Sequence, residues 1–200
     1  MKSKQNEQHF LKCLSKGLKA SLFALFFLIS SVISAQTDFL EIPSITLDGQ
    51  VYELKWSAHA RQKVVQEYLL PNETITRYST KIILEYIPDR TVESVANARF
   101  SDLVDGKEAG RVINFRQLES EDEDSEEIML EFMVGSMMAD GETRNAAEWN
   151  VYRYIPGQEG VIVLAMSRRA YGEESIRAFL QEINQNRENW INSVAENRLQ

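Results

Sequence analysis

The sequence predicts an α+β domain, an antiparallel sheet covered by helices on both faces, which is a three-layer sandwich. The first observation is the expected element order, ββ-αα-ββββ-α, because runs of strands followed by runs of helices are typical of antiparallel sheets. The second is the segment 161–166, which is apolar at successive positions and therefore favours cover on both faces. The third is the supply of amphipathic helical segments that could provide this cover.

The first half of the domain holds four expected elements, in order: strands over 51–56 and 63–70, then helices over 75–87 and 92–104. The two helices are indicated by apolar residues that recur at steps of three and four positions. Pro88 is expected to end the first helix, because proline disfavours helix at the residue before it. Asp89 or Thr91 can cap the second helix, and Gly106 lies where that helix is expected to end.

The second half holds four expected strands and one long helix: strands over 111–118, 127–134, 147–155 and 161–167, and a helix from Glu173. A five-residue loop, 156–160, would join the last two strands as a hairpin. This loop places Ile155 opposite Val161 and Glu148 opposite Arg168. The opposite charges of the second pair support that register.

Composition excludes several classes of protein. The 200 residues include 22 Lys+Arg and 30 Asp+Glu, for a net charge of −8, with one cysteine and two histidines. These counts exclude a Cys/His zinc module and a disulfide scaffold. The acidic balance without a basic stripe argues against nucleic acid, which needs clustered Lys and Arg. We expect no cofactor and no nucleic-acid partner.

Residues 1–35 resemble a secretory signal peptide. Five lysines precede the uncharged segment 20–33, and Ala35 supplies a small residue at the expected cleavage point. The alternative is a retained membrane anchor, but 20–33 is shorter than the roughly 20 residues that a spanning helix needs. We expect a single domain over 36–200 that is periplasmic or secreted, has no membrane span and no cysteine, and carries a net charge of −12.

The segment 119–127 is strongly acidic and suggests a weak metal site. Hard cations such as Ca²⁺ take oxygen ligands, and the candidate ligands are Glu121, Asp122, Glu123 and Asp124. The EF-hand spacing is absent. A solvated loop of like charges, or a loop that binds a basic partner, explains the same residues.

The candidate binding residues are four aromatics and one arginine: Trp56, Tyr68, Tyr152, Tyr154 and Arg168. Trp and Tyr dominate binding hot spots, and strand alternation puts Tyr152 and Tyr154 on one face. The alternative is that these aromatics form the core between sheet and helices. Arg168 and Arg169 form a basic pair that could meet an anionic ligand, and pairing with Glu148 explains it as well.

No catalytic residue is assigned. His59 is the only histidine beyond residue 35, and a surface position explains it, although a Ser-His-Asp arrangement that uses it stays open. The Gly-x-Ser-x-Gly elbow and the glycine-rich phosphate loops are absent.

The segment 66–74, QEYLLPNET, reads as a strand, a turn and the start of a helix. With the segment 1–35 before it and the strands and helix after it, it resembles small exported bacterial proteins of unassigned function. The element order is similar to that of the photosystem II extrinsic subunit PsbP and its relatives. The resemblance implies an α/β/α sandwich and a non-catalytic binding or assembly role in the cell envelope, and it assigns no site residue.

We therefore expect a non-enzymatic exported binding or assembly module of the bacterial cell envelope, with a protein or small molecule as its partner. One alternative is an inhibitor or immunity-type protein, which its negative charge would steer to a basic partner. The other is a hydrolase or lyase that uses carboxylates.

Overall fold

The computed structural model describes residues 37–60, 63–119, 125–137 and 144–199. They belong to the compact unit Gln36–Gln200. The expected signal peptide, its cleavage point after Ala35, and the candidate metal ligands Glu121, Asp122, Glu123 and Asp124 lie outside the described residues. These expectations stay predictions.

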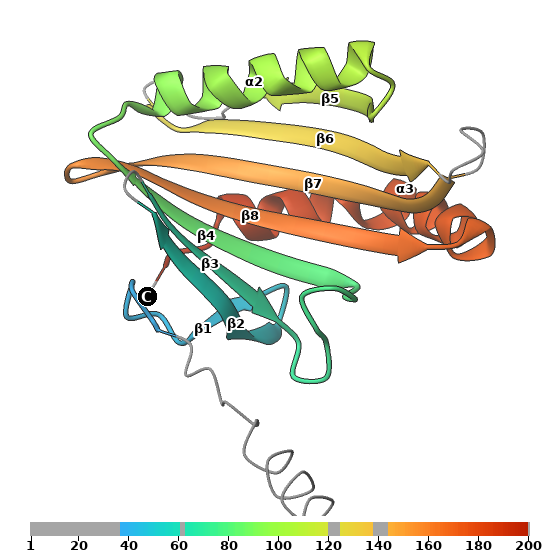
Figure 1. Cartoon of the computed structure of the whole chain (residues 1–200), viewed down its shortest axis with the longest axis horizontal. Helices are drawn as coiled ribbons and strands as arrows, with labels where there is room; N and C mark the ends of the chain where they lie inside the picture. The colour runs from blue at the N-terminus through green and yellow to red at the C-terminus, as the bar shows by residue number, and fades with distance from the viewer. Residues whose placement is uncertain (1–36, 61–62, 120–124, 138–143, 200) are drawn as a thin grey trace, which may run out of the picture. The chain divides into compact units, whose positions relative to one another are not determined.

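One antiparallel sheet dominates the domain and curves into a half-barrel (Figure 1). Its eight strands are β1 (Ser44–Leu47), β2 (Gln50–Ala60), β3 (Lys63–Leu69), β4 (Thr80–Pro88), β5 (Val112–Leu118), β6 (Ile128–Met137), β7 (Arg144–Gly157) and β8 (Gly160–Tyr171). The strand order across the sheet is β1-β2-β3-β4-β8-β7-β6-β5. Each half of the chain thus forms a four-stranded meander, and the last strands of the two meanders pair at the centre.

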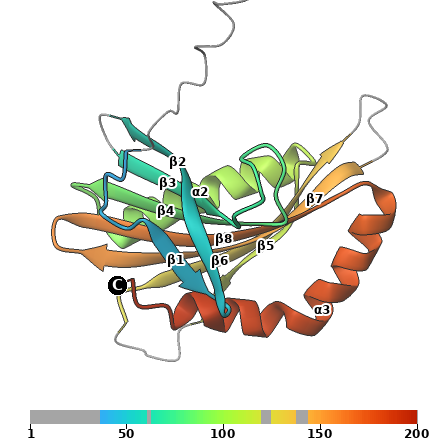
Figure 2. The ribbon, with the colours of Figure 1, turned by 90° about the horizontal axis from the view of Figure 1, so that it is seen from below.

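Two helices lie on opposite faces of this sheet (Figures 1 and 2). Helix α2 (Val92–Glu108) connects the two meanders and packs on β5 to β8, while α3 (Glu173–Ala195) follows β8 and packs on β7 and β8. Alternate residues of β7 enter the two cores: Trp149 and Val151 belong to the α3 side, and Tyr152 and Tyr154 to the α2 side. The alternation of a strand thereby builds two separate cores.

The predicted three-layer sandwich with the order ββ-αα-ββββ-α is wrong. The observed order is ββββ-α-ββββ-α, and the molecule is mostly sheet, with each helix covering only some of the strands. The segment 75–87, predicted as a helix, contains most of β4 instead. In β4, Ile82 and Leu84 enter the α3-side core, whereas Ile83 enters the α2-side core. A central strand that is buried on both faces is apolar at nearly every position, so its pattern includes a helical stripe.

The expected strands at 51–56 and 63–70 and the four expected strands of the second half are confirmed as β2, β3 and β5 to β8, and the helix from Glu173 is confirmed as α3. Strand β1 was not predicted. The predicted register of the last hairpin is wrong by one residue, because Ile155 pairs with Ile162 and Glu148 with Arg169. Pairing continues to Gly157 and Gly160, so the connection is a two-residue turn and not a five-residue loop.

Helix α2 begins as the sequence predicts and ends at Glu108, four residues beyond the expected 92–104. The Thr91 hydroxyl accepts a hydrogen bond from the Ser94 backbone N–H at 3.3 Å, which satisfies one of the free donors of the first turn. Gly106 lies inside the helix, and its C-cap is Ala109. A Cβ at Gly106 would be 2.6 Å from Val112 Cγ2, so glycine lets the helix approach β5 closely.

Candidate functional site

A cavity with a volume of about 590 Å³ is lined by the β3–β4 connection, the end of β8 and the start of α3. Three guanidinium groups line it: Arg77, Arg168 and Arg169. We call it the arginine cavity. It forms where β8 ends and α3 begins, and Arg168 and Arg169 are both among its lining residues although their side chains leave the strand on opposite faces.

Arg168 is held against helix α3. Its guanidinium lies over the Trp190 ring, 3.9 Å from the centroid, and its Nη2 donates to Glu182 Oε1 at 2.8 Å. The Arg168 Nε is buried and has no hydrogen-bond partner among the described residues. Stacking on an aromatic face fixes the plane of a guanidinium and leaves its remaining donors available.

Arg169 is held by a carboxylate and a tyrosine on the opposite face. Its Nε donates to Glu148 Oε2 at 2.5 Å, and the Tyr78 hydroxyl donates to the same oxygen at 2.7 Å. The guanidinium also lies over the Tyr78 ring, 4.7 Å from the centroid. Burial, followed by the nearby Glu148 charge, raises the pKa of Tyr78. Tyr78 therefore acts as a hydrogen-bond donor at neutral pH.

Arg77 has no carboxylate partner in the described part of the chain and lies over the Tyr171 ring, 5.5 Å from the centroid. The loop that carries it is anchored by Glu73, whose Oε1 accepts from the Ser79 backbone N–H at 2.7 Å and the Ser79 hydroxyl at 2.6 Å. Backbone hydrogen bonds in both directions between Thr74 and Arg77 close the loop. A free positive charge is thus presented on an ordered turn.

The arginine cavity is positively charged in an acidic protein. Three arginines line it against two glutamates, Glu73 and Glu182. Planar guanidiniums recognise carboxylate and phosphate groups through paired N–H donors. The arrangement suits an anionic group, with Arg77 contributing the charge that no protein carboxylate neutralises.

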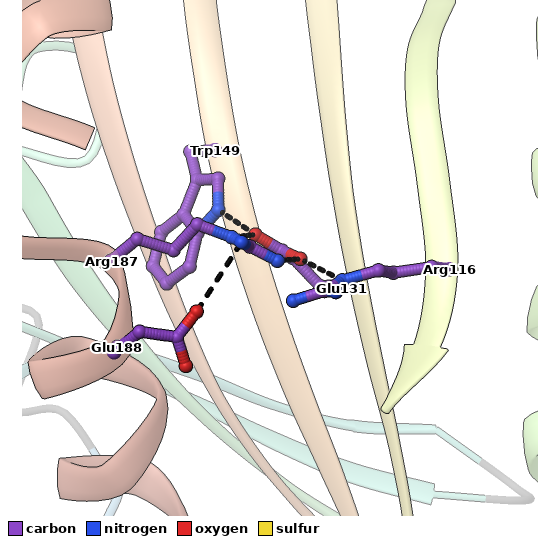
Figure 3. A network of polar contacts seen from close by, with 5 residues as sticks. All are labelled: Arg116, Glu131, Trp149, Arg187 and Glu188. Atoms are coloured by element: carbon purple, nitrogen blue, oxygen red, sulfur yellow. Dashed lines mark hydrogen bonds and ion pairs between the residues drawn. The ribbon is translucent and has the colours of Figure 1, made fainter. Parts of the chain in front are cut away.

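A second polar cluster surrounds Glu131 of β6, between the sheet and α3 (Figure 3). Glu131 Oε1 accepts from Trp149 Nε1 at 2.6 Å and from Arg187 Nε at 2.5 Å. Its Oε2 accepts from Arg187 Nη2 at 2.5 Å and from Arg116 Nε at 2.8 Å. With four donors on two oxygens, this carboxylate is fully occupied and serves to attach the helix to the sheet.

The structure separates the five predicted binding residues. Tyr152 and Tyr154 lie together beneath α2, and both line a pocket of about 150 Å³. Arg168 lines the arginine cavity and pairs with Glu182, not with Glu148. Tyr68 is buried in the α3-side core, where its hydroxyl donates to the Ile42 carbonyl at 2.9 Å, and Trp56 is 42% exposed on β2. A binding role for these residues stays a prediction.

Sequence reasoning missed Arg77 and the half-buried Arg99 of α2. Arg77 was hidden because its segment was assigned to a helix, whereas it forms a turn before β4. Arg169 was noted beside Arg168, but the predicted register gave its partner Glu148 to Arg168. Assigning a two-residue turn between Gly157 and Gly160 would have given the observed register, in which Glu148 pairs with Arg169. His59 is exposed on β2, with its ring 5.4 Å from that of Phe39.

In the described ranges, no helix is long and apolar enough to cross a membrane. Within the same residues, no group of three or more His, Cys, Asp or Glu side chains is arranged to hold a metal ion.

A family model matches residues 40–199, which span all the strands and both helices described above. No curated protein matches the sequence. The family match does not support the PsbP-like relation. Since the match covers more than half of the chain, the protein belongs to this family, an uncharacterised bacterial one.

Proposed function

We propose that this chain is an exported, non-enzymatic binding protein of the bacterial envelope that holds an anionic group of its ligand in the arginine cavity. The observation that carries the proposal is the set of three guanidiniums, each stacked on an aromatic ring, around one cavity of about 590 Å³. Pockets for small ligands have volumes of about 300–1,000 Å³.

Stacking supports binding because it reduces the freedom that an arginine loses when a ligand arrives. Arg168 lies on Trp190 and Arg169 on Tyr78, and both are also tied to carboxylates. An ordered side chain adds less entropic cost to association than a mobile one, by about 0.5–1.5 kcal/mol. Arg77 supplies the positive charge, and the ordered side chains of Arg168 and Arg169 line the cavity beside it.

A binding role agrees with the way the neighbouring carboxylates are used. Glu148 accepts from Arg169 and Tyr78, and Glu182 accepts from Arg168. Glu73 Oε1 accepts two hydrogen bonds from Ser79. A general base must reach the proton that it removes, and these oxygens are turned toward protein donors.

The binding test uses the purified protein with inorganic phosphate, succinate and citrate as probes, measured by isothermal titration calorimetry at low and high salt. We expect at least one probe to bind, and Arg77→Gln to weaken that binding roughly tenfold or more, because a hydrogen bond to a charged group contributes about 1.5–3 kcal/mol. Arg90→Gln is the matched control, since Arg90 lies at the start of α2 and its Nε contacts only the Ser94 hydroxyl. Absence of binding by all three probes, or equal binding by Arg77→Gln, would contradict the proposal.

Export is tested separately. The full chain, produced in a bacterial host, is fractionated and its N-terminus is sequenced. We expect envelope or medium fractions to contain protein that begins at Gln36. Uncleaved chain confined to the cytosol would refute export and leave the binding proposal standing.

A further inference from the structure

A second pocket lies between α2 and the sheet and shares no lining residue with the arginine cavity. Its volume is about 150 Å³. Its defining side chains are Arg99 from α2 and Tyr152 and Tyr154 from β7, and we call it the tyrosine pocket. The Lys63 side chain also lines the pocket; it is 43% exposed and forms an ion pair with Glu85 at 3.0 Å.

The Tyr154 hydroxyl is the unusual group in this pocket. Tyr154 is 1% exposed, and no described residue accepts a hydrogen bond from its hydroxyl, whose polar neighbour is the Arg99 guanidinium. Burial raises the pKa of Tyr154 to about 12, against the opposing charge of Arg99, so the hydroxyl keeps its proton at neutral pH. Arg99 carries donors only and cannot accept this proton. A buried donor without an acceptor is unfavourable, which points to an acceptor that binds from outside.

Arg99 is the second polar group of the pocket, and it interacts with the Tyr154 hydroxyl and with the charge of Glu85. Its guanidinium lies over the Tyr152 ring, 5.1 Å from the centroid, and it forms no ion pair with any described carboxylate. The pocket's own acids are Glu85, which is bound by Lys63, and Asp102, one turn along α2. The two positive charges of the lining, Lys63 and Arg99, balance the two negative charges, Glu85 and Asp102. A ligand with one negative charge is therefore tolerated better than a ligand with two.

The remaining wall of the pocket is apolar. It consists of Ile87, Val95, Ala98 and Val163. A water molecule takes a share of about 30 Å³ in the liquid, so the volume holds roughly five non-hydrogen atoms. The pocket therefore combines one polar end with a short hydrophobic compartment.

We propose that the tyrosine pocket binds a short-chain aliphatic monocarboxylate. One carboxylate oxygen accepts from the Tyr154 hydroxyl, the Arg99 guanidinium faces the same carboxylate, and the alkyl chain contacts Val95, Ala98 and Val163. Glu85 and Asp102 disfavour a dianion such as phosphate. This site is independent of the proposed function, because no lining residue is shared with the arginine cavity.

The first test varies the ligand and needs no variant. Acetate, propionate and butyrate are titrated into the purified protein by calorimetry and by thermal melting, with propionamide and inorganic phosphate as comparators. We expect propionate to bind and raise the melting temperature, and propionamide, which lacks the charge but has the same size, to bind at least tenfold more weakly. A failure of all three carboxylates to bind at millimolar concentration, or equal or tighter binding by propionamide, overturns the proposal. Phosphate is also a probe for the arginine cavity. The affinities of phosphate and propionate are therefore compared in the Arg77→Gln variant, in which binding at the arginine cavity is weakened. Tighter binding of phosphate than of propionate by this variant also overturns the proposal.

The second test uses Tyr154→Phe and Arg99→Gln, with Tyr86→Phe as the control. Tyr86 donates to the Glu159 carbonyl at 3.3 Å and does not line the pocket. We expect Tyr154→Phe to melt close to the original protein without ligand, because the substitution removes a buried hydroxyl proton that no described group accepts, and yet to bind propionate roughly tenfold more weakly. Arg99→Gln should weaken binding at least as much, and Tyr86→Phe should leave it unchanged. Unchanged propionate affinity in Tyr154→Phe or Arg99→Gln refutes the site.

Discussion

Arg187 of helix α3 holds Glu131 of strand β6 through two parallel hydrogen bonds, both 2.5 Å long (Figure 3). The two residues are far apart in sequence, and the pair attaches the helix to the sheet. Trp149 and Arg116 donate to the same carboxylate at 2.6 and 2.8 Å. A bidentate pair with two further donors satisfies a buried carboxylate, whereas removal of the carboxylate leaves the buried Trp149 N–H without a partner and the two partly exposed guanidiniums unpaired.

Glu131→Ala is therefore expected to lower the free energy of unfolding by about 1–3 kcal/mol, the range for leaving a buried donor unsatisfied, because water can solvate the two partly exposed guanidiniums. Chemical denaturation followed by circular dichroism measures the change. Glu188→Ala is the matched control, because the Glu188 side chain is 72% exposed and only its Oε1 meets Arg187, at 3.3 Å. We expect the control to change stability by less than about 0.5 kcal/mol. Equal effects of the two variants would show that the cluster does not attach α3 to the sheet.

Gly160, at the start of β8, is expected to tolerate no side chain. A Cβ there would lie 2.3 Å from the Ile87 carbonyl oxygen and 2.8 Å from Pro88 Cα, and both are backbone atoms of β4. Gly160→Ala should lower the free energy of unfolding by about 1–3 kcal/mol, since the strands must move apart. Thermal melting measures the loss. Gly110→Asn is the control, because a Cβ at Gly110 meets nothing within 4 Å and asparagine tolerates its φ of +71°. A melting temperature for Gly160→Ala equal to that of the control would contradict the close β4–β8 contact.

Alkaline pH is expected to unfold the protein through its buried tyrosines. Burial raises the pKa of Tyr68 and Tyr154 to about 12, and it also raises the pKa of Tyr52, Tyr78 and Tyr152 above the ordinary value of about 10. The folded state therefore binds these protons more tightly than the unfolded state. Their contribution to stability is fully present below pH 10 and is lost as the pH rises from about 10 toward 12. Denaturation curves at a series of pH values, with tyrosinate absorbance, measure this loss; titration of these five tyrosines near pH 10 in a still folded protein would contradict it.

Trp56 is expected to account for most of the fluorescence quenching by acrylamide. It is 42% exposed on β2, whereas Trp149 and Trp190 are 2% and 3% exposed and lie with ring centroids 5.4 Å apart. Trp56→Phe should remove most of the accessible component, and Trp190→Phe should leave it in place. If Trp56→Phe kept the accessible component and Trp190→Phe removed it, the exposed position of Trp56 on β2 would be contradicted.

Strand β4 shows why periodicity alone led to the wrong fold class. Ile82, Ile83, Tyr86 and Ile87 recur at helical steps, and this spacing is also found in any strand that is apolar on both faces. What decides between the two is the neighbours: β3 and β8 supply hydrogen bonds on both sides of β4. Those partners lie elsewhere in the sequence, so a local pattern contains no information about them.

The candidate sites show the same division. Tyr152 and Tyr154 were placed on one face from alternation alone, and they do line one pocket. Arg77 and Arg168 could not be related before the fold was known, because they come together only where the β3–β4 turn meets the end of β8. A one-residue difference in hairpin register also decides which arginine pairs with Glu148.

By itself, the amino-acid order determined the strands of the second meander, the cap of α2, the long amphipathic α3 and the acidic charge, since these depend on side chains close in sequence. Tertiary structure decided that 80–88 is a strand, that the sheet has eight strands and that three arginines surround one cavity. These outcomes depend on contacts between distant segments, and burial and strand pairing outweigh local propensity wherever the two disagree.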